Sequence, residues 1–235
     1  MAIAFDTSAS TTGQFPGTTT IVVNITSGAI SDGCFVLGIG SEDASTSATV
    51  SSVVSVPALT WILVDNATAT AGGNDQIAHL YYAVGVAAST GYVVTVTFGA
   101  TVDYFPGAYV ASFSGVDQST PQDAEGENSS VDTSITSLSA TLTTVTAGAM
   151  LVDCFVWGGG GDGNPSAGSG QTGFVGTVDF FGGYELMGGA AAQTDTVNFT
   201  SASSNDRYAM VVVALKPSSG AAAVTPQRMM LMGVS

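Results

Sequence analysis

The sequence is poor in positive charge. Its 235 residues include three basic side chains, Arg207, Lys216 and Arg228, against 18 acidic ones, and the formal net charge is −15. Proteins that bind nucleic acid place lysine and arginine against the phosphates, where these cations displace condensed counterions. Docking on an anionic membrane surface uses the same side chains. We therefore expect neither nucleic acid nor a membrane surface among the partners of this protein.

Histidine and cysteine are scarce as well. His79 is the only histidine, and it lies in the apolar segment IAHLYYAVG without a G-x-S-x-G motif elsewhere, so the pattern of a serine hydrolase is missing. Cys34 and Cys154 are the only cysteines, and with one histidine they do not form a zinc site of the usual type. Each cysteine begins an apolar run, which favours a buried small hydrophobic side chain. A disulfide between them is the alternative, if two similar halves bring them together.

Long apolar segments are also missing. No uncharged stretch reaches the roughly 18 residues that a bilayer-spanning helix needs, and the segment MAIAFDTSAST has neither the basic nor the apolar region of a secretory signal. Charged residues make up only 9% of the chain, so small polar residues must build most of the surface. Such an acidic, lysine-poor surface suits a protein that works outside cells after release in a particle by lysis, although compositional drift would produce the same balance.

What the sequence does contain is β-strand patterning along most of its length. Segments rich in Val, Ile, Thr, Tyr and Phe alternate with clusters of Gly, Ser, Asn and Asp, and no 3.6-residue apolar period is visible. The predicted strands begin at Thr18, Cys34, Ala48, Leu59, Ile77, Tyr92, Tyr109, Ser137, Met150, Thr177, Thr194 and Tyr208. This pattern predicts an all-β protein built as an antiparallel β-sandwich.

The strands are of two kinds. TVTF and SATLTTV alternate between apolar and polar residues, which predicts one buried face and one wet face. MVVVAL and TIVVNI are nearly continuous in apolar residues, which predicts central strands covered on both faces. We expect the second sheet to cover one face of these strands and a neighbouring subunit to cover the other.

The chain also repeats itself. Tyr82 opens YAVGVAASTGYVVTVTFG and Tyr184, 102 residues later, opens YELMGGAAAQTDTVNFT; Tyr109 opens YVASFSGV and Tyr208, 99 residues later, opens YAMVVVALKP. The motifs GCFVLG at 33–38 and DCFVWG at 153–158 form a third pair. These matches predict one domain over 1–217 with similar halves at about 18–116 and 137–217, joined by a polar, acidic connector at 117–136.

Carboxylates are the candidates for chemistry, because glycoside hydrolysis needs only two of them at a suitable separation. Asp65, Asp153, Asp179 and Glu185 are the candidates in this sequence. Asp153 and Asp179 lie within or beside apolar runs, where burial raises the pKa of a carboxyl group that has no partner. Nothing in the spacing selects a pair, so we predict no enzyme activity, no catalytic residue and no cofactor.

Two further groups of residues could bind ligands. Asp162 and Asn164, in the glycine-rich loop that begins at Gly158, are candidate calcium ligands, with a solvated acidic loop as the competing interpretation. Aromatic side chains would offer sugar-stacking platforms if they face outward, or would fill the sandwich core if they face inward. These aromatic residues are Trp61, Trp157, Tyr81, Tyr82 and Tyr104.

The last segment, 218–235, combines a linker, SSGAAAVTP, with the apolar end QRMMLMGVS. A methionine-rich segment after a flexible linker is typical of a segment that docks in a groove of a partner or of a sister subunit. The predicted partner-binding residues are Met229, Met230, Leu231 and Met232. The alternative is that this end folds back onto its own sandwich.

Two segments carry a resemblance to a known group of proteins. SFSGVDQSTP from Ser112 and VVVALKP from Val211, within strand patterning that runs from Phe5 to Pro217, resemble uncharacterised phage and environmental viral proteins encoded among virion structural genes. The resemblance implies a jelly-roll or lectin-like β-sandwich on the outside of a virus particle. It brings no catalytic residues with it.

These observations lead to two functional hypotheses. The first is a phage virion structural protein, either a capsid decoration or a subunit of a fibre or tail appendage, which forms homo-oligomers and contacts other virion proteins. The second is a carbohydrate-binding module, free or displayed on the virion, that recognises cell-surface glycans. A polysaccharide-cleaving enzyme is a third interpretation, with Asp153, Asp179 and Glu185 as the residues to test.

Overall fold

The computed structural model describes residues 1–11, 17–44, 48–131, 134–158, 163–177, 179–200 and 206–219. Every regular element in these ranges is a β-strand, and all strand ladders are antiparallel, which confirms the predicted all-β antiparallel sandwich. The first eight strands are β1 (Ala4–Thr11), β2 (Thr18–Thr26), β3 (Gly33–Asp43), β4 (Val50–Val56), β5 (Ile62–Ala71), β6 (Asn74–Val86), β7 (Gly91–Val102) and β8 (Phe105–Ser114). The next eight are β9 (Gln122–Ser130), β10 (Ser137–Thr143), β11 (Met150–Gly158), β12 (Ser166–Ala167), β13 (Thr172–Gly176), β14 (Phe180–Leu186), β15 (Ala192–Asn198) and β16 (Arg207–Leu215).

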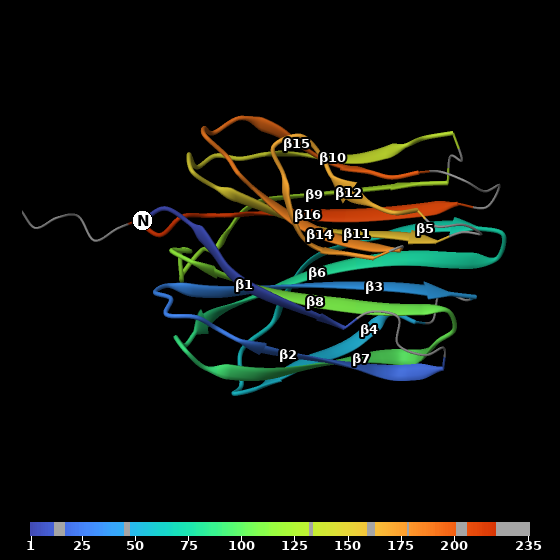
Figure 1. Cartoon of the computed structure of the whole chain (residues 1–235), viewed down its shortest axis with the longest axis horizontal. Helices are drawn as coiled ribbons and strands as arrows, with labels where there is room; N and C mark the ends of the chain where they lie inside the picture. Colours follow the sequence, from blue (N-terminus) through green and yellow to red (C-terminus); the bar gives the residue numbers. More distant parts are fainter. Residues whose placement is uncertain are drawn as a thin grey trace, which may run out of the picture.

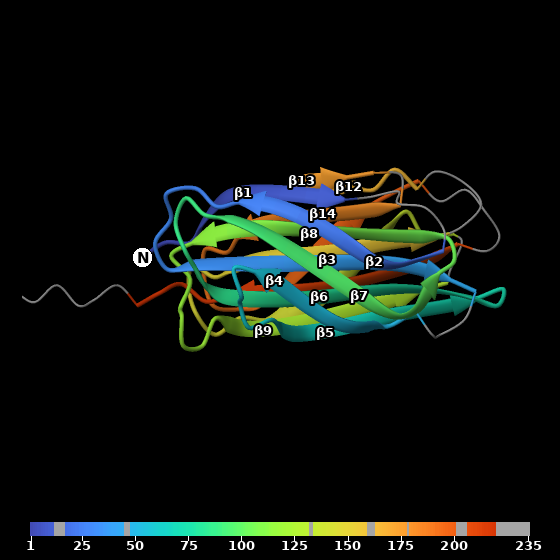
Figure 2. The same cartoon turned by 90° about the horizontal axis from the view of Figure 1, so that it is seen from below.

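The strands form four sheets that stack as four layers (Figure 1). The first narrow sheet has the order β2-β7-β4, and the first wide sheet has the order β1-β8-β3-β6-β5. The second wide sheet, β13-β14-β11-β16-β9, packs against the first wide sheet, and the second narrow sheet, β10-β15-β12, lies on its other side. Seen from below, strands of the first narrow sheet cross obliquely over the first wide sheet (Figure 2).

The two pairs of sheets have the same topology. Adding eight to each strand number turns β1-β8-β3-β6-β5 into β9-β16-β11-β14-β13, and β2-β7-β4 into β10-β15-β12. Each order is that of a jelly roll whose fifth strand has joined the wide sheet. The recurring sequence blocks lie on matching strands, since the paired tyrosines fall on β6 and β14 and on β8 and β16, and the cysteines fall on β3 and β11.

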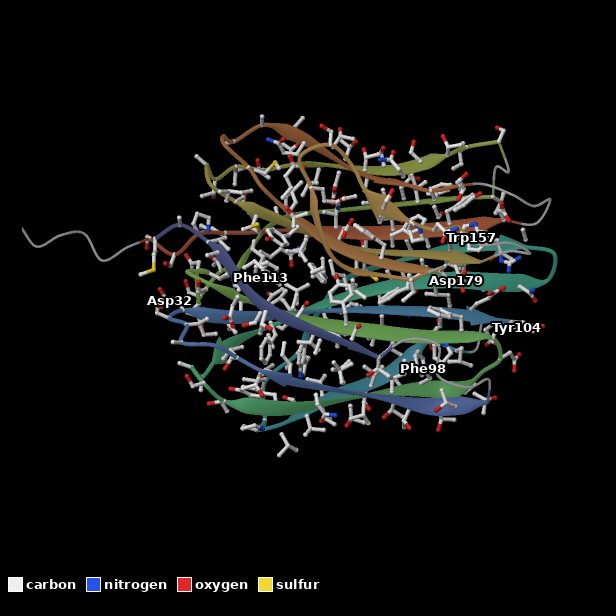
Figure 3. The ribbon with its side chains drawn as sticks, in the orientation of Figure 1. Asp32, Phe98, Tyr104, Phe113, Trp157 and Asp179 are labelled. Carbon is white, nitrogen blue, oxygen red and sulfur yellow. The ribbon has the colours of Figure 1, made fainter. Side chains whose placement is uncertain are left out.

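Three apolar cores fill the spaces between the four layers. The central core lies between the two wide sheets and includes Phe113, whereas Phe98 belongs to the core between the first wide and first narrow sheets (Figure 3). The third core lies between the second wide and second narrow sheets. Each wide sheet is therefore covered on both faces, which explains the continuous burial along β3, β8, β11 and β16.

This arrangement corrects two expectations. The sequence predicted that a neighbouring subunit would cover the outer face of the continuous strands, but the other half of the same chain covers it. The segment TIVVNI was expected to be covered on both faces, yet β2 lies in a narrow sheet, where Ile21 and Val23 are buried and Val22 is exposed. Val54, Val56 and Val93 are exposed on the same outer face as Val22.

The strands that the sequence did not predict lie mostly at sheet edges. β9 runs through the segment interpreted as a connector, where its polar residues QDAEGENSS pair with β16 on one side. β1 and β13 are the other edges that were missed, and β12 is only two residues long. An edge strand is held by backbone hydrogen bonds to a single neighbour, so it does not need the alternating apolar pattern on which strand prediction depends.

Polar contacts fix how the two halves meet. The Tyr109 hydroxyl of β8 donates to the backbone carbonyl of Asp153 in β11. Its ring fits where neighbouring strands carry glycine, because a Cβ at Gly38 or Gly182 would come within 2.3 or 2.6 Å of a ring carbon. Arg207 of β16 forms an ion pair with Glu42 of β3 and donates to the carbonyl oxygen of Ala71 at 3.3 Å. The halves therefore meet at one defined position.

Cys34 and Cys154 are both free and fully buried, as the interpretation of small hydrophobic side chains predicted. The Cys154 thiol donates to the carbonyl oxygen of Ile39 at 3.7 Å. Ile39 lies five residues beyond Cys34 on β3, which is a rise of roughly 16 Å along the strand. A disulfide needs Cα atoms only about 4.4–6.8 Å apart, so the two cysteines are too distant to be bonded.

Removal of the Arg207 side chain should destabilise the protein strongly. Arg207 is only 2% exposed, and Arg207→Ala would leave the partly buried Glu42 carboxylate without its cation. We expect the free energy of unfolding in urea to fall by about 3–5 kcal/mol. Lys216→Ala, which removes a basic side chain that bonds an exposed threonine hydroxyl, should change it by less than about 0.5 kcal/mol. Equal stability of the two variants would contradict this role of the ion pair.

The cysteines should be inert in the native protein. Burial raises the pKa of Cys34 to about 12 and raises that of Cys154 well above its usual range, so neither forms the reactive thiolate near neutral pH. We expect no reaction with a disulfide reagent such as DTNB in native buffer. Both thiols should react after denaturation in guanidinium chloride without a reductant. A denatured protein that shows no free thiol would mean that the cysteines are bonded to each other.

Candidate functional site

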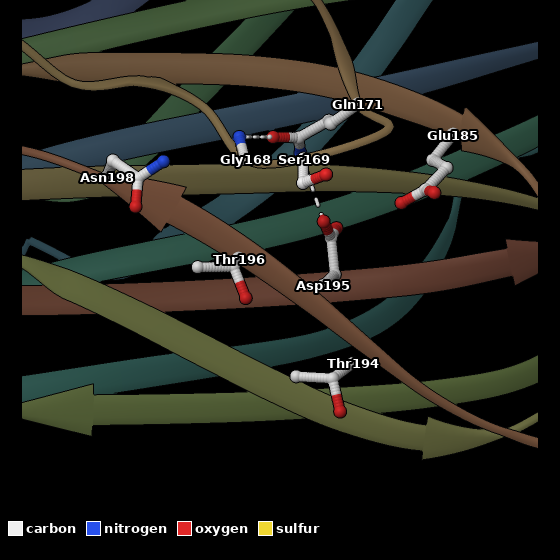
Figure 4. Close-up of a pocket in the computed structure, with 8 residues that line it drawn as sticks. All are labelled: Gly168, Ser169, Gln171, Glu185, Thr194, Asp195, Thr196 and Asn198. Carbon is white, nitrogen blue, oxygen red and sulfur yellow. Dashed lines mark hydrogen bonds between the residues drawn. The ribbon is translucent and has the colours of Figure 1, made fainter.

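A polar cavity of about 420 Å³ opens in the second half of the chain, where the short strand β12 ends beside β15. Glu185 reaches it from β14, and the turn between β12 and β13 closes one side (Figure 4). The residues that line it are Gly168, Ser169, Gln171, Glu185, Thr194, Asp195, Thr196 and Asn198. The cavity therefore lies between the second narrow sheet and the edge of the second wide sheet.

Gln171 connects two buried carboxyl groups beside this cavity. Its Nε2 donates to Asp153 Oδ2 at 2.6 Å and to Asp195 Oδ1 at 3.1 Å. Its Oε1 accepts from the backbone N–H of Gly168 at 2.9 Å, which fixes the orientation of the amide. The backbone N–H of Gly183 donates to Asp153 Oδ1 at 2.5 Å. The side chains of Asp195 and Glu185 face each other across the cavity (Figure 4).

Strand alternation explains why both aspartates point inward. Asp153 lies on β11 between Leu151 and Phe155, which belong to the core under the second narrow sheet. Asp195 lies on β15 two residues before Val197, which faces the same core. Side chains two residues apart on a strand share a face, so each aspartate points into a space that is otherwise apolar.

Burial dominates the electrostatics of this cluster. It raises the pKa of Asp195 to about 7, with a further rise from the Glu185 carboxylate and an opposing effect of the hydrogen bond from the Thr196 backbone. Burial and the neighbouring Asp195 raise the pKa of Asp153 well above its usual range, although Gly183 and Gln171 stabilise its charge. Burial also raises the pKa of Glu185. At neutral pH the cluster therefore holds protons that exposed carboxyl groups would release.

The first half of the chain provides an internal comparison. TVTF at 95–98 on β7 matches TVNF at 196–199 on β15, so Asp195 corresponds to Val94, which is fully buried. In the ladders, Val36 pairs with Tyr82 and Val152 pairs with Tyr184, which aligns Asp153 with the buried Leu37. Leu37 and Val94 lie together in an apolar core. The jelly-roll order therefore does not require the two carboxyl groups.

Of the four carboxylates that the sequence suggested, the structure brings two to this region. Asp153 is hydrogen-bonded behind the cavity, and Glu185 lines it. Asp65 lies on β5 and accepts from the Asn66 backbone, whereas Asp179 lies near Trp157 (Figure 3), whose backbone N–H donates to the Asp179 carbonyl. The grouping of Asp153 with Glu185 was not predictable from their spacing.

Asp195 and Gln171 were missed by sequence reasoning. A signal for Asp195 exists in TDTVNFT, because alternation places Asp195 on the same face as Val197 and Phe199. An aspartate on the apolar face of a strand needs hydrogen-bond partners, so it marks a candidate site. Gln171 carries no such signal, since it lies in a glycine- and serine-rich turn.

The aromatic residues do not form a common platform. Trp157 and Tyr82 are buried in cores, and Trp61 stacks on Phe35 with ring centroids 6.4 Å apart. Tyr81 is half-buried, whereas Tyr104 is 53% exposed at one end of the molecule (Figure 3). The core-filling interpretation is therefore correct for Trp157 and Tyr82. Tyr104 is not among the described residues that line the cavity.

The predicted calcium site at Asp162 and Asn164 stays a prediction. Asp162 lies outside the described residues, and Asn164 adopts a left-handed backbone with φ of 42°. Among the described residues, no three His, Cys, Asp or Glu side chains are grouped as metal ligands. His79 is 5% exposed, and burial lowers its pKa to about 4, which keeps it neutral near pH 7.

The predicted partner-binding residues, Met229, Met230, Leu231 and Met232, also lie outside the described residues. The described chain ends at Ser219, beside the N-terminus, where the Met1 ammonium group donates to the Ser218 carbonyl at 2.5 Å. A hollow of about 370 Å³ lies there, lined among others by Met1, Leu186 and Pro217. Docking by the methionine-rich segment stays a prediction.

Comparisons of the chain with protein-family models, with curated proteins and with solved structures found no match. Within the ranges that the structure describes, no helix is long and apolar enough to cross a membrane.

The stability of the protein should depend on pH through Asp195. The pKa of this group is about 7 in the folded protein, above its value of roughly 4 in an unfolded chain, so the folded state binds the proton more tightly. Its contribution is fully present below pH 4 and is lost as the pH rises to about 7, with a total change of roughly 4 kcal/mol. We expect urea unfolding to require less denaturant at pH 8 than at pH 5.

The control separates Asp195 from the general effect of net charge. Asp195→Asn should reduce the pH dependence by the share of Asp195, because the amide keeps an acceptor for Gln171 and does not titrate. The raised pKa of Asp153 leaves a second contribution of the same sign in this variant. Glu127→Gln, at an exposed position on β9, removes the same charge and should leave the dependence unchanged. Parallel pH profiles for the wild type and Asp195→Asn would contradict the assignment.

Proposed function

We propose that this protein is a structural module of a phage virion, displayed on the outside of the particle as a capsid decoration or as a subunit of a fibre or tail appendage. One observation carries the proposal: a jelly-roll strand order occurs twice, and the two copies pack through their wide sheets. Jelly-roll sandwiches recur in viral capsid and lectin domains. The support is the similarity of this strand order to that of viral jelly-roll domains, so the decisive test is whether the protein assembles into oligomers.

The surface chemistry supports a role in an exposed environment. Seryl and threonyl hydroxyls face outward on the second narrow sheet, where Ser139 and Thr196 bond each other at 2.8 Å. Arg207 is buried, and the peptide bond after Lys216 precedes Pro217, which trypsin does not cleave. Arg228 is then the remaining trypsin site. The folded body should therefore resist this protease.

The continuous apolar strands are not the surface for self-assembly, because the two halves of the chain cover them. The methionine-rich residues 229–232 are left as the segment proposed to hold subunits together. Contacts with other virion proteins would use the same segment.

Removal of residues 229–235 should dissociate the oligomer. We expect the full chain to show a defined oligomeric mass by light scattering over a range of concentrations. A version ending at Arg228 retains the linker and all three basic residues, and it should be a monomer. Trypsin treatment of the full chain should yield the same product. A monomeric full chain, or an oligomer that survives truncation, would contradict self-assembly through this segment.

Carbohydrate binding is the second candidate function, and the polar cavity beside Asp195 favours it. Ligand sites are concave and carry a few fixed polar groups, as this cavity does. The two candidates are compatible, because a protein on the surface of a particle can also hold glycans. A printed glycan array probed with the labelled full chain tests the second candidate directly.

A further inference from the structure

We propose that the cavity lined by Asp195, Glu185 and Asn198 is a binding site for a neutral sugar, which it holds through the sugar's hydroxyl groups. The inference rests on the second candidate function and deepens it, because it names the site and the class of ligand. The site lies in the second half of the chain.

The dimensions and lining of the cavity suit a small polar ligand. Its volume of about 420 Å³ lies in the range of small-molecule sites, from about 300 to 1,000 Å³. The lining combines carboxyl, amide and hydroxyl groups from Glu185, Asp195, Asn198 and Ser169. Sugar hydroxyls both donate and accept hydrogen bonds, so they match a lining that offers both kinds of group.

The charge of the site selects neutral sugars over acidic ones. The described residues of its lining contribute two carboxyl groups and no basic side chain. Within the described part of the chain, Arg207 is paired with Glu42, and Lys216 bonds the Thr120 hydroxyl. No described cation is therefore positioned to hold a sialic acid or uronic acid carboxylate, which the cavity carboxyl groups would repel.

The site is organised before any ligand arrives. The Gln171 amide donates a hydrogen bond to the Asp195 carboxyl group, and the Gly168 backbone N–H donates to the oxygen of the same amide. Asp153 accepts from Gln171 and from Gly183, so it anchors this network in the core. Binding groups whose rotamers are locked by a supporting layer of hydrogen bonds lose little entropy when the ligand binds.

The cost of this network argues that it serves a purpose other than folding. The matching positions in the first half hold Leu37 and Val94, which pack in an apolar core. Burial of carboxyl groups in such positions destabilises the folded state. Polar residues on the core-facing side of a strand are candidates for function when they border a cavity. This holds more strongly where the other copy of a duplicated architecture has apolar residues at the same positions.

Protonation of Asp195 fits the same ligand. Its pKa of about 7 means that near neutral pH the carboxyl group carries a proton for part of the time. A protonated carboxyl group donates one hydrogen bond and accepts others, as a sugar hydroxyl requires. None of the described residues that line the cavity is aromatic, so binding would depend on hydrogen bonds, and we expect affinities in the roughly millimolar range.

The test uses the full chain and defined probes. Methyl glycosides of glucose, galactose, mannose and N-acetylglucosamine would be titrated to about 20 mM while backbone amide shifts are followed by NMR. Glucuronic acid and N-acetylneuraminic acid are the acidic comparisons. We expect at least one neutral glycoside to shift amides of residues 168–171 and 194–198, and we expect no shift with the acidic sugars.

Variants then assign the site. Glu185→Ala removes a half-buried lining side chain and should weaken binding about tenfold or more. Glu127→Ala removes an exposed carboxylate of β9 and should leave the affinity within about twofold. Glu185→Gln, which keeps the shape of the side chain, guards against a fold defect, and amide spectra of all variants report directly on folding.

The outcomes separate the site from the wider function. If Glu185→Ala and Glu185→Gln bind the glycan array as the wild type does, the cavity is not the site. The proposal of carbohydrate binding would still stand. Preferential binding of the acidic sugars would overturn the ligand class. A blank array together with no amide shifts for any glycoside would overturn both the cavity proposal and the second candidate function.

Discussion

The burial of the two wide sheets against each other is the constraint on which the rest of the structure depends. Each of these sheets already packs against a narrow sheet on one side, so its other face is covered by the wide sheet of the other half of the chain. Strands β3, β8, β11 and β16 are apolar on both faces for this reason. The ion pair of Arg207 with Glu42 and the bond from Tyr109 to Asp153 then fix the relative position of the halves.

Because the topology is duplicated, the two halves of the chain can carry different residues at equivalent core positions. Both halves keep the same strand order, so the apolar contacts that hold the sheets together are made twice. The first half fills the core between its wide and narrow sheets with residues such as Leu37 and Val94. The second half accepts Asp153 and Asp195 in the equivalent core and opens a polar cavity beside them. A protein whose stability is spread over three cores can tolerate a costly network in one of them.

Individual residues show how far sequence patterns reach. The strand predicted from Thr18 and those from Ser137 and Met150 begin where predicted, because their apolar periodicity reflects burial on a sheet face. β9 was missed since an edge strand needs only backbone partners. The candidate site was partly predictable from the sequence, because Asp153 and Glu185 were candidate carboxylates. Gln171 bonds Asp153 and Asp195 only because the turn after β12 folds back toward β15.

The sequence by itself determined the all-β class and the buried and exposed faces of alternating strands such as SATLTTV, because these follow from local periodicity. Tertiary structure alone decided what covers the apolar strands, how far apart Cys34 and Cys154 lie, and which carboxyl groups meet. Such facts depend on contacts between residues far apart in the chain, such as Arg207 with Glu42 across the two wide sheets. Local patterns specify which face of a strand is buried. Only the packing of whole sheets specifies which other sheet covers that face.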